Sequence, residues 1–157
     1  MSSKVLVALR VAATAERAFD AFTREIGAWW QPNILFGFTV GAPGRLAFEP
    51  GPGGRFTETS SDGSVFEIGR ITVWEPGRRL AFTWRQATFA AGERTEVEVR
   101  FEPLGRETRV TVEHRGWDSI ADGHVARHGF PDRIFLQRHA EWWRALLEGF
   151  AERSAAA

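Results

Sequence analysis

Five short clusters of glycine, proline and polar residues divide the middle of the chain into segments of strand length. They are GAPGR at 41–45, PGPGG at 50–54, SDG at 61–63, EPGR at 75–78 and PLGRE at 103–107. Such clusters favour tight turns, because Gly tolerates positive φ and Pro pre-sets φ for a turn. Short connections between successive strands require antiparallel neighbours. The sequence therefore predicts an antiparallel meander, with strands near 35–40, 45–49, 55–60, 64–75, 79–87, 94–102 and 108–116.

The last two predicted strands alternate between apolar and polar side chains. Val97, Val99 and Phe101 fall on one face of the first strand, and charged residues fall on the other. In the second strand, Val112 and His114 share the apolar face. This period of two is typical of an antiparallel sheet with one face in water and the other covered.

Helical spacing occurs on both sides of the meander. After a first strand over 4–12, Thr14 is a candidate N-cap for a helical pattern that reaches Ile26, and Gly27 can divide this pattern into two short helices. Residues 134–153 form a longer helical pattern. Its apolar stripe consists of Leu136, Ala140, Trp143, Leu147 and Phe150. A helix of about 20 residues spans about 30 Å and can cross a whole sheet.

These elements predict an α+β fold in which a curved antiparallel sheet wraps around a long C-terminal helix, with two short helices after the first strand. No repeat or linker divides the chain, so we expect a single domain over 1–157 with its core at about 4–153. Residues 117–133 are expected to form a loop with a short helix. A curved sheet that holds a long helix often leaves space beneath it, which suggests a pocket.

The composition excludes several classes of function. Twenty basic and twenty acidic residues cancel, so no overall field attracts nucleic acid or an anionic membrane. No apolar run approaches the roughly 20 residues that cross a bilayer, and the N-terminus lacks the layout of a signal peptide. There is no cysteine, and therefore no disulfide or thiolate chemistry. We expect a cytoplasmic protein.

Several short sequence motifs, taken in their order along the chain, resemble those of the SRPBCC superfamily of helix-grip proteins, also called START-like or Bet v 1-like. Within it, the chain resembles the branch named after the activator of Hsp90 ATPase homologue. The motifs are AERAFDAFTREIGAWW, EPGPGGRF followed by DGS, GRITVWEPGRRLAFTW, EVEVRFEPLGRETRVTVEHRGW and WWRALLEGF, from about residue 5 to 151. The segment 117–133 departs from the family pattern, because it is longer and richer in His and charge.

The resemblance implies a cavity between the sheet and the C-terminal helix, used across the superfamily for apolar or amphipathic small molecules. Seven Trp and thirteen Phe can line such a cavity or simply fill a core, and their apolar character alone does not separate the two. The predicted lining residues are Trp29, Trp30, Phe66, Trp74, Phe82, Trp84, Val99, Val112, His114, Trp143 and Leu147.

His114 is the most informative of these residues, because it occupies the inward side of a strand where an apolar residue would be expected. A buried imidazole needs a hydrogen-bond partner. It is either a satisfied structural histidine, or a polar group that orients a ligand or acts as a general base. His114 is therefore the best candidate for a catalytic residue, although no catalytic motif accompanies it.

Other polar residues carry weaker signals. His124, His128 and His139, with Asp118, Asp122 and Asp132, invite a metal interpretation, but there is no HExxH, and nearby glycines and Pro131 oppose a helix at 117–133. We expect these histidines in a solvated loop, with no metal site and no cofactor. Alternation places Arg85 and Arg100 on the solvated sheet face, whereas the side of Arg70 stays open, because a strand that contains Gly69 can carry a bulge.

Three functions remain open. The first is a binding module for a small apolar or amphipathic molecule, with His114 as its polar contact. The second is an enzyme of the cyclase or hydrolase kind that uses His114 as a base in the same cavity. The third, which rests only on the family resemblance, is a co-chaperone of an Hsp90-type partner. No nucleic-acid partner or membrane insertion is expected, and a homodimer is compatible with the Trp-rich composition.

Overall fold

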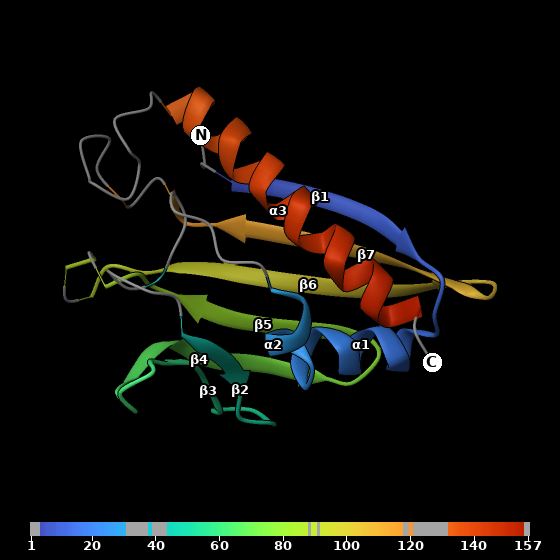
Figure 1. Cartoon of the computed structure of the whole chain (residues 1–157). Helices are drawn as coiled ribbons and strands as arrows, with labels where there is room; N and C mark the ends of the chain where they lie inside the picture. The colour runs from blue at the N-terminus through green and yellow to red at the C-terminus, as the bar shows by residue number, and fades with distance from the viewer. Residues whose placement is uncertain are drawn as a thin grey trace.

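The computed structural model describes residues 4–30, 38, 44–87, 89–90, 92–117, 120 and 132–155. Its strands and helices follow one another along the chain as in Figure 1. They are β1 (Lys4–Val11), α1 (Ala15–Thr23), α2 (Ile26–Trp29), β2 (Arg45–Phe48), β3 (Arg55–Thr59), β4 (Val65–Glu75), β5 (Arg79–Trp84), β6 (Thr95–Leu104), β7 (Glu107–Arg115) and α3 (Asp132–Ala155).

The strands of the described chain form one seven-stranded antiparallel sheet in the order β1-β7-β6-β5-β4-β3-β2. This sheet is curled, and α3 crosses one of its faces, with α1 and α2 beside it (Figure 1). The predicted α+β helix-grip architecture is therefore confirmed. The helix predicted at 134–153 is α3, while the strand predicted near 35–40 and most of 117–133 lie outside the described residues.

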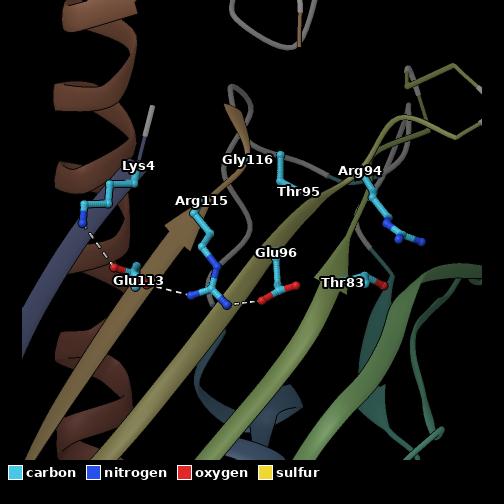
Figure 2. A pocket seen from close by; sticks show the side chains of 8 residues that line it. All are labelled: Lys4, Thr83, Arg94, Thr95, Glu96, Glu113, Arg115 and Gly116. Carbon is cyan, nitrogen blue, oxygen red and sulfur yellow. Dashed lines mark hydrogen bonds and ion pairs between the residues drawn. The ribbon is translucent and has the colours of Figure 1, made fainter. Parts of the chain in front are cut away.

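The two faces of the sheet differ as the alternation predicts. On the inner face Val99 pairs with Val112, and both are fully buried beneath the helices. On the outer face the carboxylate of Glu98 contacts Arg79 and lies 2.9 Å from Arg115. Arg115 also binds Glu113 at 2.7 Å, part of a network of paired charges drawn in Figure 2. The solvent-exposed face of the sheet therefore carries ion pairs, and the buried face carries packed apolar and aromatic side chains.

Strand β4 contains the bulge expected near Gly69. Its register with β3 shifts between Phe56 and Thr57, so that Ile68 has no direct partner on that strand. Gly69 lies against the backbone of β5, where a Cβ atom would fall 1.7 Å from the carbonyl oxygen of Thr83. The tight bend of the sheet at this point therefore requires glycine.

The N-terminal helices begin and end for identifiable reasons. Thr14 caps α1 by accepting a hydrogen bond from the Arg17 amide at 3.1 Å, as predicted. The break between α1 and α2 falls at Arg24 and Glu25, not at Gly27, because Gly27 is itself helical in α2. No helix among the residues described is long and apolar enough to span a membrane.

Replacing Gly69 with Ala should lower the free energy of unfolding by about 3 kcal/mol, because the added methyl group meets a backbone oxygen that cannot rotate away. Urea denaturation measures this change. Gly27→Ala is the matched control, because its Cβ would approach Leu46 O only to 3.2 Å and Ala favours a helix. That control should stay within about 1 kcal/mol of the native chain. Equal losses in the two variants would contradict the bulge argument.

Candidate functional site

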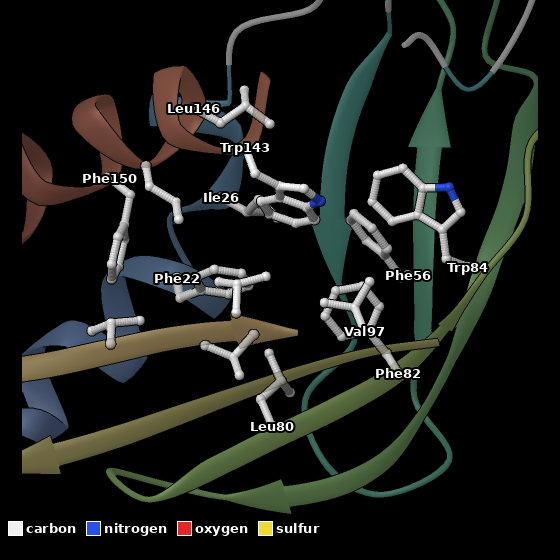
Figure 3. Close-up of a cluster of buried hydrophobic side chains, with 14 of the residues drawn as sticks. Phe22, Ile26, Phe56, Leu80, Phe82, Trp84, Val97, Trp143, Leu146 and Phe150 are labelled. Carbon is white, nitrogen blue, oxygen red and sulfur yellow. The ribbon is translucent and has the colours of Figure 1, made fainter. Parts of the chain in front are cut away.

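The polar centre of the inner face lies at one end of the sheet, where β5 ends, β6 begins and β7 ends. Trp84 pairs with Thr95, and Val97 pairs with His114, so the register brings Trp84, Thr95 and His114 together. From the helix layer above, α3 adds Trp143. Figure 3 shows Trp143 pointing from α3 toward Trp84, and the two ring centroids lie 5.9 Å apart.

Hydrogen bonds connect the two layers through the imidazole of His114, which is fully buried. Its Nε2 lies 2.7 Å from the hydroxyl of Thr95, which in turn donates to the carbonyl oxygen of Trp84 at 3.3 Å. Its Nδ1 lies 3.0 Å from Nε2 of His139 and 3.3 Å from the indole nitrogen of Trp143. One strand histidine is therefore tied to the sheet on one side and to the helix on the other.

The partners of His114 determine where its proton lies. An indole N–H can only donate, so Trp143 requires Nδ1 of His114 to be the acceptor. The proton of His114 is then on Nε2 and is donated to Thr95. His139 must likewise donate from its Nε2 to the same Nδ1, which leaves the lone pair of His139 on its own Nδ1. This arrangement requires the imidazole of His114 to be neutral, because a protonated Nδ1 cannot accept a hydrogen bond.

Burial favours the same neutral state. Desolvation, followed by the proximity of His139, holds the pKa of His114 well below its ordinary value of 6.5. Desolvation lowers the pKa of the His139 imidazole from 6.5 to about 3. A buried charge here would lose its hydration without gaining an opposite charge in the network, so the electrostatics agree with the tautomers inferred from the hydrogen bonds.

Aromatic rings surround this network. The ring of Trp84 lies 4.7 Å from that of His114, and the rings of Trp142 and Trp143 each lie 5.6 Å from that of Trp30. Trp30 is partly exposed, while Trp84, His114, Trp142 and Trp143 are buried, as is His139. We call this group, Trp30, Trp84, His114, His139, Trp142 and Trp143, the histidine–tryptophan cluster. It presents ring faces and edges around a few polar atoms.

The predicted lining residues do not form one site. Trp30, Trp84, His114 and Trp143 come together in the cluster. Trp29 lies beside it but uses its indole N–H on the carbonyl oxygen of Ala21, at 2.7 Å.

The remaining predicted residues lie elsewhere in the fold. Trp74 packs against Phe19 toward the other end of the sheet, with ring centroids 5.0 Å apart. Phe66 is half-buried, with the guanidinium of Arg85 over its ring at 4.8 Å. Phe82, Val99, Val112 and Leu147 are buried in the packed interior. Contact with a ligand remains a prediction for every residue of the set.

Sequence reasoning missed His139, and the expectation that it lies in a solvated loop is wrong. It lies in α3 and is 1% exposed. The buried stripe of α3 is rotated from the predicted one, because Phe135 and His139 are buried while Leu136 and Ala140 are only partly so. Spacing could have found it, since His139 stands four residues before Trp143.

Among the described residues, no group of three His, Asp or Glu side chains is arranged so that it could hold a metal ion. His124, His128, Asp118 and Asp122 lie outside the described part, as does the side chain of Asp132. The nitrogens of the two cluster histidines that face each other are 3.0 Å apart and share a proton, which is a hydrogen bond and not a pair of ligands.

A depression of about 480 Å³ lies on the outer face at the same end of the sheet (Figure 2). Its walls are Lys4, Thr83, Arg94, Thr95, Glu96, Glu113, Arg115 and Gly116. Glu113 is paired with Arg115 at 2.7 Å and with Lys4 at 3.5 Å, and Arg115 is also paired with Glu96. Because these charges satisfy one another, the inner cluster is the stronger candidate site.

A curled antiparallel sheet around a long C-terminal helix defines the helix-grip class of the SRPBCC superfamily. The family model described as activator of Hsp90 ATPase homolog 1-like protein matches residues 12–154, and the chain belongs to this family. No curated protein matches the chain.

Solved structures with the same fold are similar over nearly their whole length. A protein from Mesorhizobium loti has 20% identity and a TM-score of 0.66, with 96% of this chain and 95% of that chain covered. The Aha1 dimer from Colwellia psychrerythraea has 15% identity and a TM-score of 0.61, with coverage of 92% and 90%. An anthrahydroquino-gamma-pyrone synthase, Txn09, complexed with SUM, has 31% identity and a TM-score of 0.56, with 96% of each chain covered.

Acidification from pH 7.5 to 5 should destabilise the folded chain, because its buried histidines resist protonation. The unfolded chain binds protons at its histidines below about pH 6.5, whereas the folded pKa of His139 is about 3, so stability is full above 6.5 and falls as the pH falls below it. Between pH 7.5 and 5 His139 alone should cost about 2 kcal/mol, and His114 acts in the same direction. Urea denaturation at several pH values measures the loss.

Two variants test whether the loss of stability at low pH comes from the buried histidines. His139→Phe should remove about half of the pH dependence. Glu25→Gln is the control, because the pKa of Glu25, lowered mainly by its hydrogen bond from Arg17, affects stability only below its ordinary value of 4.5. A free energy of unfolding that does not change between pH 7.5 and 5 would show that the histidines are not buried and neutral.

Proposed function

We propose that this protein binds a planar, apolar small molecule with aromatic rings at the histidine–tryptophan cluster. The observation that carries the proposal is a fixed, neutral polar network enclosed by aromatic rings. Small-molecule sites commonly combine apolar walls with a few precisely held polar groups, which set the orientation of the ligand. Ring-on-ring contacts favour a flat aromatic molecule over an aliphatic one.

Trp30 gives the ligand a route to the cluster. It is the partly exposed member of the group, and its ring lies 6.0 Å from Trp84 and 5.7 Å from Trp29. A ligand that stacks on Trp30 meets the edges of the buried rings behind it. The 31% identity with Txn09, a synthase of a polycyclic aromatic product by its name, supports the same class of ligand for this chain.

Native mass spectrometry on protein purified gently from its own host tests the proposal directly. We expect an additional mass of a few hundred daltons that is lost on denaturation. A chain that carries no such mass and binds no polycyclic aromatic compound added to it would contradict the proposal.

Replacing Trp30 with Ala should weaken the binding of a tricyclic aromatic probe, 9-fluorenone, at least about tenfold, because the stacking surface is lost. Equilibrium dialysis gives the dissociation constants. Trp74→Ala is the matched control, since it removes a half-buried Trp that packs on Phe19, away from the cluster. The affinity of Trp74→Ala for 9-fluorenone should stay within about twofold of the native value. Equal weakening by both variants, or tighter binding by Trp30→Ala, would contradict a role of Trp30 as ligand wall.

Catalysis is the second candidate, and the two cluster histidines are the observation in its favour. The inferred tautomers put a lone pair on Nδ1 of His139, whereas Nδ1 of His114 receives two donors, so in this candidate His139 and not His114 would take a proton from a substrate carbon next to a carbonyl group. A base with a pKa of about 3 accepts such a proton poorly at neutral pH, because an efficient general base has a pKa near the working pH. The electrostatics therefore favour binding over catalysis.

His139→Gln separates these two functions. A glutamine amide can still donate to His114 but cannot accept a proton, so the affinity for 9-fluorenone should stay within about threefold of the native value. Incubation of the native chain and the variant with linear poly-β-ketone substrates, followed by product analysis, gives the second readout. Ring closure by the native chain that stops in His139→Gln would establish catalysis in place of simple binding.

Protein partners have weaker support. The exposed large apolar side chains of the described surface are Leu6, Val65, Leu104 and Ile134, and each belongs to a different element, so they do not indicate one docking surface for a chaperone. A homodimer, the state named for the Colwellia relative, is readily tested by analytical ultracentrifugation.

A further inference from the structure

The indole N–H of Trp84 is a buried donor of the cluster that the described part of the chain leaves unused. The side chain is 1% exposed, and within the described part of the chain its Nε1 has no hydrogen-bond partner. Figure 3 places this nitrogen on the side of the ring turned away from Phe56 and Phe82. A buried donor without an acceptor is costly and rare in native proteins, so it calls for a specific explanation.

The polar atoms of His114 and Thr95 are committed to other hydrogen bonds and do not supply the missing acceptor. Nδ1 of His114 already receives the donors of His139 and Trp143. The hydroxyl of Thr95 receives the proton of His114, and it donates its own proton to the backbone of Trp84. The ring of Trp142 stands at 85° to that of Trp84, with the centroids 5.9 Å apart. An N–H contact with such a ring face is a second-order interaction and leaves most of the cost unrecovered.

We infer that Trp84 donates this hydrogen bond to a carbonyl oxygen of the bound molecule, so that the ligand is a planar aromatic ketone or quinone. The inference rests on the proposed function and specifies the chemistry of its ligand. A neutral acceptor fits the cluster, because both imidazoles are neutral and an anion would lose its hydration without meeting a positive charge from them. A carbonyl oxygen can accept the N–H of Trp84 and brings no proton of its own that would need an acceptor.

A matched pair of probes tests the requirement for a carbonyl group. 9-Fluorenone and fluorene share one tricyclic skeleton and differ at the carbonyl carbon. The native chain should bind fluorenone about tenfold more tightly than fluorene in equilibrium dialysis, because only fluorenone satisfies the buried donor. The ratio of the two dissociation constants cancels the contribution of ring stacking that the probes have in common.

A near-isosteric substitution then identifies the donor. Trp84→3-benzothienylalanine replaces the N–H by sulfur while keeping the bicyclic ring, and it should reduce the preference for fluorenone to within about twofold of unity. Trp29→3-benzothienylalanine is the control, because the N–H of Trp29 is used on Ala21 at 2.7 Å. In this control the preference for fluorenone should persist. Without ligand, the melting temperature should fall for the Trp29 variant but not for the Trp84 variant, whose lost N–H had no partner.

The possible outcomes separate the two levels of the proposal. Loss of the preference in the Trp84 variant alone supports the inference. A preference that persists in the Trp84 variant overturns it, as does equal binding of the two probes by the native chain, and both results leave aromatic binding intact. If the native chain binds neither fluorene nor fluorenone, the proposed function itself is overturned, and this inference with it.

Discussion

The arrangement of the interior depends on the hydrogen bond that crosses from Trp143 of α3 to His114 of β7. Among the described partners of His114, the indole is the one whose role as donor is fixed by its chemistry, and through His114 it determines which atoms of Thr95 and His139 donate. The same hydrogen bond fixes the position of α3 along the sheet, because it joins one residue of the helix to one residue of β7. Apolar packing alone tolerates sliding between layers, whereas a buried donor and acceptor must meet or both lose their hydration.

Most of the architecture could be predicted from the sequence, because its signals are local. Turn clusters such as SDG at 61–63, alternation such as that of Val97, Val99 and Phe101, and the long stripe before Phe150 each depend on near neighbours in the chain. Even the bulge beside Gly69 was indicated by a glycine within a strand pattern. The break between α1 and α2 was misplaced, since a single glycine is tolerated inside a short helix that packs on the sheet.

The site was harder to predict, because it is made by contacts between distant residues. His114 could be recognised from the sequence alone, because it is a polar side chain on the strand face that otherwise carries valines. Its partners Thr95 and His139 are 19 and 25 residues away, and the sequence gives no sign that they meet. The choice between core and ligand wall is harder still, since Phe82 and Trp84 carry the same apolar pattern while only Trp84 adjoins the polar network. The resemblance to a family supplied the fold and left this choice open.

The hydrogen bonds around His114 also form a chain with a direction. Each donor points from the helix toward the sheet, from His139 to His114, from His114 to Thr95, and from Thr95 to the carbonyl of Trp84. Aligned bonds polarise one another, so electron density accumulates at the end that lies in α3. Without the indole of Trp143, the two imidazoles could exchange the roles of donor and acceptor, and the hydroxyl of Thr95 could donate to His114 instead of accepting from it. One tryptophan N–H thus removes a degeneracy that would otherwise leave the interior with two electrostatic states.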